Sequence, residues 1–174
     1  MKRILLCISF AATALLTAES AGGIRWTAPP AWKAQGARPM RAATYAVPAA
    51  PGDKEDGECA VFYFGPGQGG GIDDNITRWI GQFEQPDGKA SRAAAKISRQ
   101  PFNGVPVTMV DLTGTYMAAA GPMSPTKTPR PGYRLLGAIA DSPQGAVFFK
   151  LTGPGKTVAA AQPAFQNLLK SLSR

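Results

Sequence analysis

The sequence contains no histidine. Histidine is the usual general base beside a serine or cysteine nucleophile and a common zinc ligand, so its absence excludes those catalytic sites and the usual zinc centres. Carboxylates remain as acid–base groups. The segment 53–58 is rich in them, but its spacing does not fit a calcium-binding loop. We therefore expect no catalytic residue, no metal site, no cofactor and a non-enzymatic protein.

Cysteine is scarce, with one residue near the N-terminus and one in the body of the chain. Cys7 lies in a segment that has a positive start, an apolar run over 4–16 and small residues before position 21. These features predict a signal peptide over 1–20, cleaved on export, and a single domain over 21–174. The alternatives are an uncleaved membrane anchor and a lipid on Cys7. Cys59 lies in the apolar run ECAVFYFG, so we expect it to be buried.

Long basic runs are also absent, although the net charge is +8. The lysines and arginines are scattered and no aromatic residues alternate with them, which argues against a nucleic-acid interface. The charge predicts only a weak affinity for anionic surfaces. We expect the protein to lie in the periplasm or outside the cell.

Periodicity predicts strands in the first half of the chain, then a helix over 72–83, two hairpins and a C-terminal helix. The dipeptide Asn103–Gly104 is typical of a tight hairpin turn between Phe102 and Val105. The segment 118–134 is rich in proline and is expected to be an irregular loop. Hairpins covered by a few helices indicate an α+β domain.

Glycines at 65, 67 and 70 match the spacing of a dinucleotide-binding loop, between a strand and a helix. Two extended segments precede that strand, which does not fit such a fold. We also expect Asp73 or Asp74 to cap the helix and place negative charge where a phosphate would bind. The sequence therefore predicts a structural turn and no bound nucleotide.

The same helix presents a polar row formed by Asn75, Arg78 and Gln82, beside Trp79. Amides, a guanidinium and an indole suit a sugar or a carboxylate. The alternative is a solvated helix surface in which Arg78 pairs with Asp74.

The segment 118–134 is the second candidate contact region, through Lys127, Arg130 and Tyr133. Loops on a rigid scaffold often carry function. The alternative is a mobile surface loop without a partner.

Three phrases, IRWTAPPAWKAQGARPMRAATYAV, GGGIDDNITRWIGQFE and FFKLTGPGKTV with FQNLLKSL, resemble exported bacterial proteins of unknown function. These are similar to the PsbP/Mog-like α/β/α sandwich. The resemblance implies a single domain with a mainly antiparallel central sheet, in which Trp26, Trp32 and Trp79 are structural. Members of that fold class serve as assembly subunits, GTPase-binding proteins and lipoproteins, so the resemblance does not identify a chemistry.

From these observations we expect an exported, non-enzymatic binding or accessory protein whose partner is a protein or another envelope component. One alternative is an envelope hydrolase that uses carboxylates alone, such as Asp111, Asp141 and the acidic segment 53–58. Another is a charge-driven binder of membranes or polyanions.

Overall fold

The computed structural model describes residues 18–119 and 126–174, so most of the predicted signal peptide lies outside the described residues. Its main sheet is antiparallel in every described pairing, which confirms the predicted α+β class with a mainly antiparallel sheet. The strands lie in the order β3, β4, β5, β10, β9, β8, β6, and β7 also pairs with β8. In that order, and ending with β7, they span Lys33–Ala34, Arg41–Val47, Gly57–Tyr63, Val147–Pro154, Lys127–Ala140, Val105–Ala119, Phe83–Glu84 and Lys96–Phe102.

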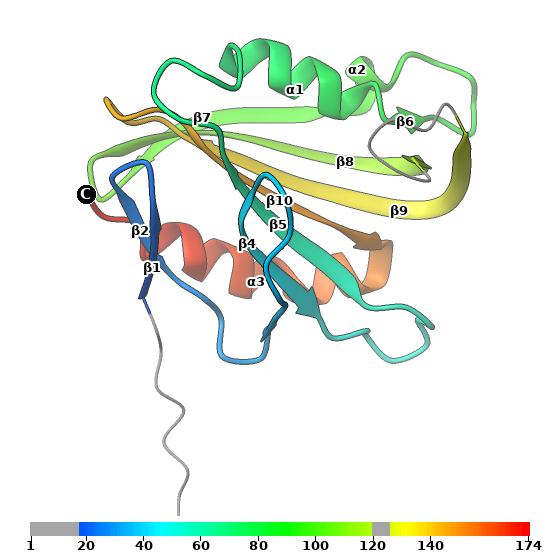
Figure 1. Ribbon diagram of the computed structural model, residues 1–174. Coiled ribbons are helices and arrows are strands. Elements are labelled where there is room, and N and C mark those ends of the chain that lie inside the picture. The colour runs from blue at the N-terminus through cyan, green and yellow to red at the C-terminus, as the bar shows by residue number, and fades with distance from the viewer. Residues whose placement is uncertain (1–17, 120–125) are drawn as a thin grey trace, which may run out of the picture.

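A separate hairpin and three helices complete the domain. The hairpin consists of β1 (Ala18–Ala21) and β2 (Ile24–Thr27), and the helices are α1 (Ile72–Ile80), α2 (Ser91–Ala94) and α3 (Gly155–Lys170). Figure 1 shows α1 and α2 on one side of the sheet and α3 on the other.

Alternating side chains of the strands belong to two hydrophobic cores, one on each face of the sheet. On β10, Phe149 belongs to the core under α3, together with Val158 and Phe165 of that helix. The preceding residue, Phe148, belongs to the core under α1, together with Trp79. Successive residues of a strand point to opposite faces of a sheet, so the apolar run of β10 supplies both cores. Cys59 and the three tryptophans are buried, as predicted.

The turn between β7 and β8 confirms the predicted hairpin. Phe102 pairs with Val105, and the two residues between them have positive φ angles, 47° at Asn103 and 78° at Gly104. This is the backbone of a type I′ turn, which favours asparagine and glycine because both adopt the left-handed region readily. The expected helices are present as α1 and α3, but the predicted end of the first helix at residue 83 was wrong. Gly81 ends α1 after Ile80, so Gln82 lies beyond the helix and Phe83 begins β6.

The predicted cap of α1 was wrong. Gly71 occupies the cap position and no side chain caps the helix. The two aspartates lie inside the first turn, two and three positions beyond the cap. Asp73 instead forms an ion pair with Arg99, with 2.6 Å between Oδ1 and Nη2.

The predicted loop over 118–134 was also wrong over much of its length. Its residues 120–125 lie outside the described residues, but β9 already begins at Lys127 and pairs with the end of β8. Two of the four prolines of this segment, Pro129 and Pro131, lie in β9 and precede the point at which β10 joins it, opposite Tyr133. Among the described strands, β9 has a partner on one side only here, and proline is tolerated in a strand with such a free edge.

Candidate functional site

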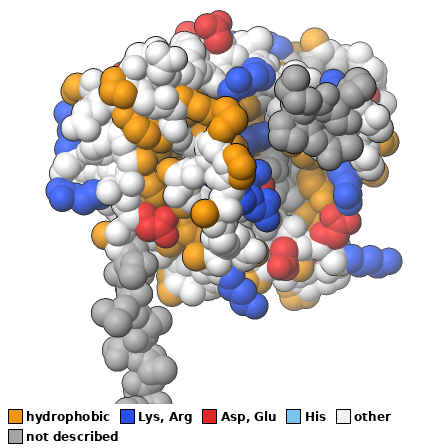
Figure 2. Space-filling model, in the orientation of Figure 1, with side chains coloured by type: hydrophobic (Ala, Val, Ile, Leu, Met, Phe, Trp, Pro, Cys, Tyr) orange, Lys and Arg blue, Asp and Glu red, His pale blue; other side chains and the backbone are white. Residues whose placement is uncertain are grey.

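The α1 side of the sheet is covered over β8 and β9 but open over β5. On β5, Cys59 and Val61 point to the α3 side and have no exposed surface. The alternate residues Glu58 and Phe62 point to the α1 side and are partly exposed. We call the surface formed by the side chains of Arg41, Glu58, Phe62, Tyr116 and Lys150 the open face. Figure 2 shows lysine and arginine side chains gathered near the middle of this view.

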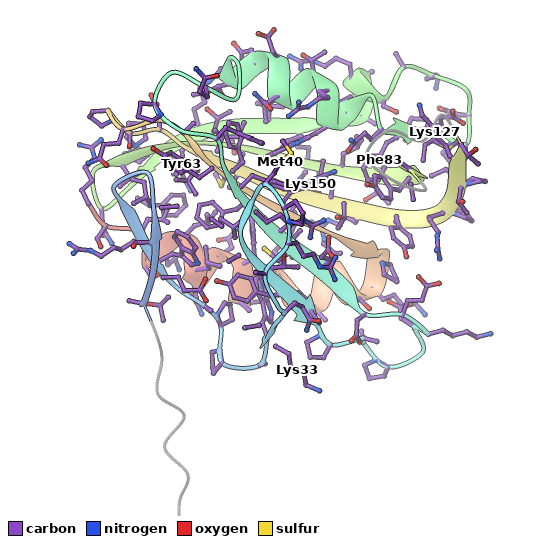
Figure 3. The ribbon with its side chains drawn as sticks, viewed as in Figure 1. Lys33, Met40, Tyr63, Phe83, Lys127 and Lys150 are labelled. Carbon is purple, nitrogen blue, oxygen red and sulfur yellow. The ribbon has the colours of Figure 1, made fainter. Side chains whose placement is uncertain are left out.

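Lys150 of β10 lies at the centre of the open face (Figure 3). Its Nζ donates a hydrogen bond to Oε1 of Gln82, just after α1, over 2.5 Å. The same ammonium group lies 5.3 Å from the centre of the Tyr116 ring, within the range of a cation–π interaction. Lys150 thus connects the end of α1 with β8 across the sheet.

The electrostatic surroundings of Lys150 disfavour its charge. Burial lowers the pKa of Lys150 to about 8, and the neighbouring positive charges of Arg78 and Arg41 act in the same direction, while Glu58 opposes them. Among the described residues, no carboxylate lies within ion-pair distance of Lys150. The carboxylate of Glu58 is engaged by Arg41 over 2.8 Å and by Arg38 over 3.0 Å.

Two stacked aromatic rings connect the surroundings of Lys150 with the second predicted contact region, residues 118–134. Tyr116 stacks on Tyr133 with 6.0 Å between ring centres. The Tyr133 hydroxyl donates to Oε2 of Glu55 over 2.7 Å, and Arg130 donates to both oxygens of the same carboxylate. Burial and the hydrogen bond to Glu55 raise the pKa of Tyr133 to about 12. Tyr133 and Arg130 are therefore held in fixed positions beside the open face.

The six predicted contact residues have different surroundings. Gln82 bonds to Lys150, and Tyr133 stacks on Tyr116. Like burial, the charge of Arg78 lowers the pKa of Lys150, and Arg130 binds Glu55 beside Tyr133. Lys127 is exposed at the start of β9 and is drawn well away from Lys150 in Figure 3.

Asn75 belongs to the fold. It is 2% exposed, and its Nδ2 donates to the carbonyl oxygens of Gly69 and Gly71, each over 2.8 Å. Its Oδ1 accepts a hydrogen bond from Arg78. Arg78 and Asp74 form no ion pair within the described part of the chain. Asn75 thus closes the glycine-rich loop.

The sequence analysis did not identify Lys150, Arg41, Glu58 or Tyr116 as site residues. A signal for Lys150 was present, because it is the one charged residue in the strand VFFKLTGP. A lone lysine in a buried strand indicates a function or an internal partner.

The carboxylates proposed for a hydrolase do not converge. Asp111 is bound by Arg134 through two hydrogen bonds of 2.8 and 2.7 Å. The amide of Asp141 bonds to Pro106, five residues from Asp111 along β8, which corresponds to roughly 17 Å. In the acidic segment, Asp53 accepts from Thr157 and Glu55 from Arg130. Asp53, Glu55 and Asp111 thus each have a separate partner in the fold.

No group of metal-ligating side chains occurs among residues 18–119 and 126–174. Within the same residues, no helix has both the length and the apolar character needed to cross a membrane.

Comparison with known proteins yields a fold and no established function. No model of a known protein family matches the chain, and no curated protein matches it. The solution structure of cyanobacterial PsbP (CyanoP) from Synechocystis is similar over 95% of this chain and 96% of its own, with a TM-score of 0.53 and 11% identity. A protein of unknown function from Pseudomonas aeruginosa, described as a putative regulator, is similar over 91% of this chain and 96% of its own, with a TM-score of 0.46 and 14% identity. The chain has a PsbP-like fold.

Proposed function

We propose that this protein is an exported, non-enzymatic accessory protein of the cell envelope that binds a partner protein through the open face. Its scaffold would be the α/β/α sandwich of the PsbP/Mog-like class. The observation that carries the proposal is the convergence of Gln82, Tyr133 and Lys150 around Tyr116 on a sheet surface that no described helix covers.

The composition of the open face supports a protein partner. Tyrosine and arginine are enriched in the energetically important parts of protein interfaces. Arg41 of the open face is already held by Glu58, and Tyr133 beside the face is held by Glu55. Side chains ordered before binding lose little conformational entropy when a partner docks, and this favours affinity.

The glycine-rich loop is given no ligand-binding role here, because of how its backbone is bonded. A phosphate site of this type needs backbone N–H groups directed at the ligand. Two carbonyl groups of this loop are instead tied to Asn75. We therefore propose no bound nucleotide or cofactor.

Site-specific photo-crosslinking in living cells tests the binding role. A photoreactive phenylalanine analogue at Phe62 would probe the open face, and the same analogue at the exposed Asn167 of α3 would be the matched control. We expect a defined crosslinked partner from position 62 and not from position 167. Identical products from both positions, or none from position 62, would contradict the proposal.

Export is tested separately by cell fractionation and intact mass. Cleavage before Ala21 removes three of the four residues of β1, including Glu19, which accepts a 2.7 Å hydrogen bond from Tyr45. We expect the protein in the envelope fraction with a mass that corresponds to residues 21–174. A cytoplasmic protein that retains residues 1–20 would refute export.

A further inference from the structure

We propose that the open face contains a carboxylate-binding site centred on the ammonium group of Lys150, which receives an aspartate or glutamate side chain of the partner protein. This inference rests on the proposed function for the existence of a partner. What is new is the chemistry of the contact, a charge pair with a carboxylate, and the residue that forms it, Lys150.

The hydrogen-bonding capacity of Lys150 is incompletely used. A lysine ammonium group has three N–H donors, and within the described residues one of them bonds to Gln82. Charged groups removed from water are normally paired with an opposite charge. Glu58 is the acid whose field reaches Lys150, but both of its oxygens are engaged by arginines. The site therefore offers a positive group that an incoming carboxylate can pair with.

The surroundings of Lys150 favour an anion over a neutral ligand. Arg41 and Arg78 place two further positive charges close enough to affect Lys150, against the single negative charge of Glu58. The rings of Tyr116 and Phe62 flank this region, with the Arg41 guanidinium 5.4 Å from the centre of the Phe62 ring. Apolar walls exclude water and strengthen a charge pair formed between them. The open sheet surface suits a side chain presented by a folded partner.

The site has a defined dependence on pH. The charged and titratable groups facing Lys150 are Arg78 of α1, Arg41 of β4, Glu58 of β5 and Tyr116 of β8. Arginine side chains are not deprotonated in proteins. Burial raises the pKa of Tyr116, so its hydroxyl stays neutral. Lys150, with a pKa of about 8, loses its charge first. Carboxylate binding should therefore weaken as the pH rises above about 8.

A fluorescein-labelled hexaglutamate peptide is the probe, and fluorescence anisotropy measures its binding to the exported protein. At pH 6.5 we expect Lys150→Met to weaken binding about tenfold, which is typical of the loss of one close charge pair. The matched control is Lys33→Met, which removes the same charge from an exposed position on β3. It should change the affinity less than about twofold, since exposed charges contribute little. Wild-type affinity should fall about tenfold between pH 6.5 and pH 9.5.

Three results would overturn the inference: no peptide binding by the wild type at pH 6.5, equal losses in both variants, or no change with pH. Dextran sulfate in the same assay distinguishes a carboxylate site from general attraction to polyanions, which would not depend on Lys150. As a readout independent of the variant, NMR of the Lys150 Cε–Hε groups should show its pKa rising when peptide is added. An unchanged pKa would also refute the site.

The crosslinking experiment separates this inference from the proposed function. If a partner is captured from position 62 in both wild-type and Lys150→Met proteins with equal yield, the carboxylate site is refuted and the proposed function stands. If no partner is captured from the wild type, the proposed function itself fails.

Discussion

The indole ring of Trp79 lies directly on the backbone of Gly137. A Cβ atom at residue 137 would lie 2.6 Å from Cζ3 of the indole and 2.8 Å from Cγ1 of Val110. Both neighbours belong to the core under α1. The close approach of α1 to β9 therefore requires glycine at this position.

Gly137→Ala should lower the free energy of unfolding by about 2 kcal/mol, because the added methyl group must displace a packed indole. Urea unfolding followed by tryptophan fluorescence measures the change. Gly36→Ala is the matched control, because nothing lies within 4 Å of a Cβ atom at that position. Equal stability of the two variants would show that α1 does not pack on β9 in this way.

Asn75→Ala should destabilise the protein by about 2 kcal/mol, since it leaves the carbonyl groups of Gly69 and Gly71 without their side-chain donor. Thr77→Ala, two residues along α1, removes an exposed hydroxyl that donates to the Asp73 carbonyl oxygen of the same helix, and should cost less than about 0.5 kcal/mol. Thermal unfolding of both variants measures the difference. If Asn75→Ala left the stability unchanged, Asn75 would instead belong to the exposed polar row expected from the sequence.

Lys150→Met should stabilise the protein at pH 7 by an amount on the order of 2 kcal/mol, because it removes a charge that the fold disfavours. The pKa of Lys150 is about 8 in the fold and about 10.5 in the unfolded chain. Between these values the unfolded chain binds more protons, so wild-type stability rises with pH. The difference in unfolding free energy between Lys150→Met and the wild type should therefore decrease from pH 7 to pH 10.5. Urea unfolding across this range measures it, and a constant advantage would contradict the assignment.

Glu55→Gln should lower the pKa of Tyr133 toward its ordinary value of about 10, because the substitution removes the carboxylate that holds the hydroxyl proton. Absorbance at about 295 nm follows the tyrosine titration. Stability at pH 7 should fall by less than about 1 kcal/mol, since the ion pair with Arg130 is partly exposed. An unchanged titration curve would refute the contact between Tyr133 and Glu55.

The features that could be predicted from the sequence are those set by local chemistry. The turn at Asn103–Gly104 depends on two adjacent residues, and the buried face of α1 depends on spacing within one helix. Pro129 and Pro131 misled the prediction for β9, because whether a strand tolerates proline depends on where the neighbouring strand ends. That information lies in β10, outside the segment that contains the prolines.

The candidate site was less accessible to sequence reasoning for the same reason. Gln82 and Tyr133 were identified, each within its own segment. Lys150 and Tyr116, which connect them, lie in separate strands, and the lone lysine of β10 does not by itself indicate which residues it contacts. Only the order of strands in the sheet brings these four side chains together.

The position of β10 also constrains the order of assembly. β5, in the first half of the chain, pairs with β10, and β3 and β4 reach the rest of the sheet only through β5. The strands β7 to β10 form successive hairpins, and such local pairings close quickly. During synthesis, the first three strands of the sheet therefore wait for residues 147–154 to emerge. Until then, β5 is paired with β4 on one edge only, and a chaperone that holds unfolded chains would find its other edge exposed.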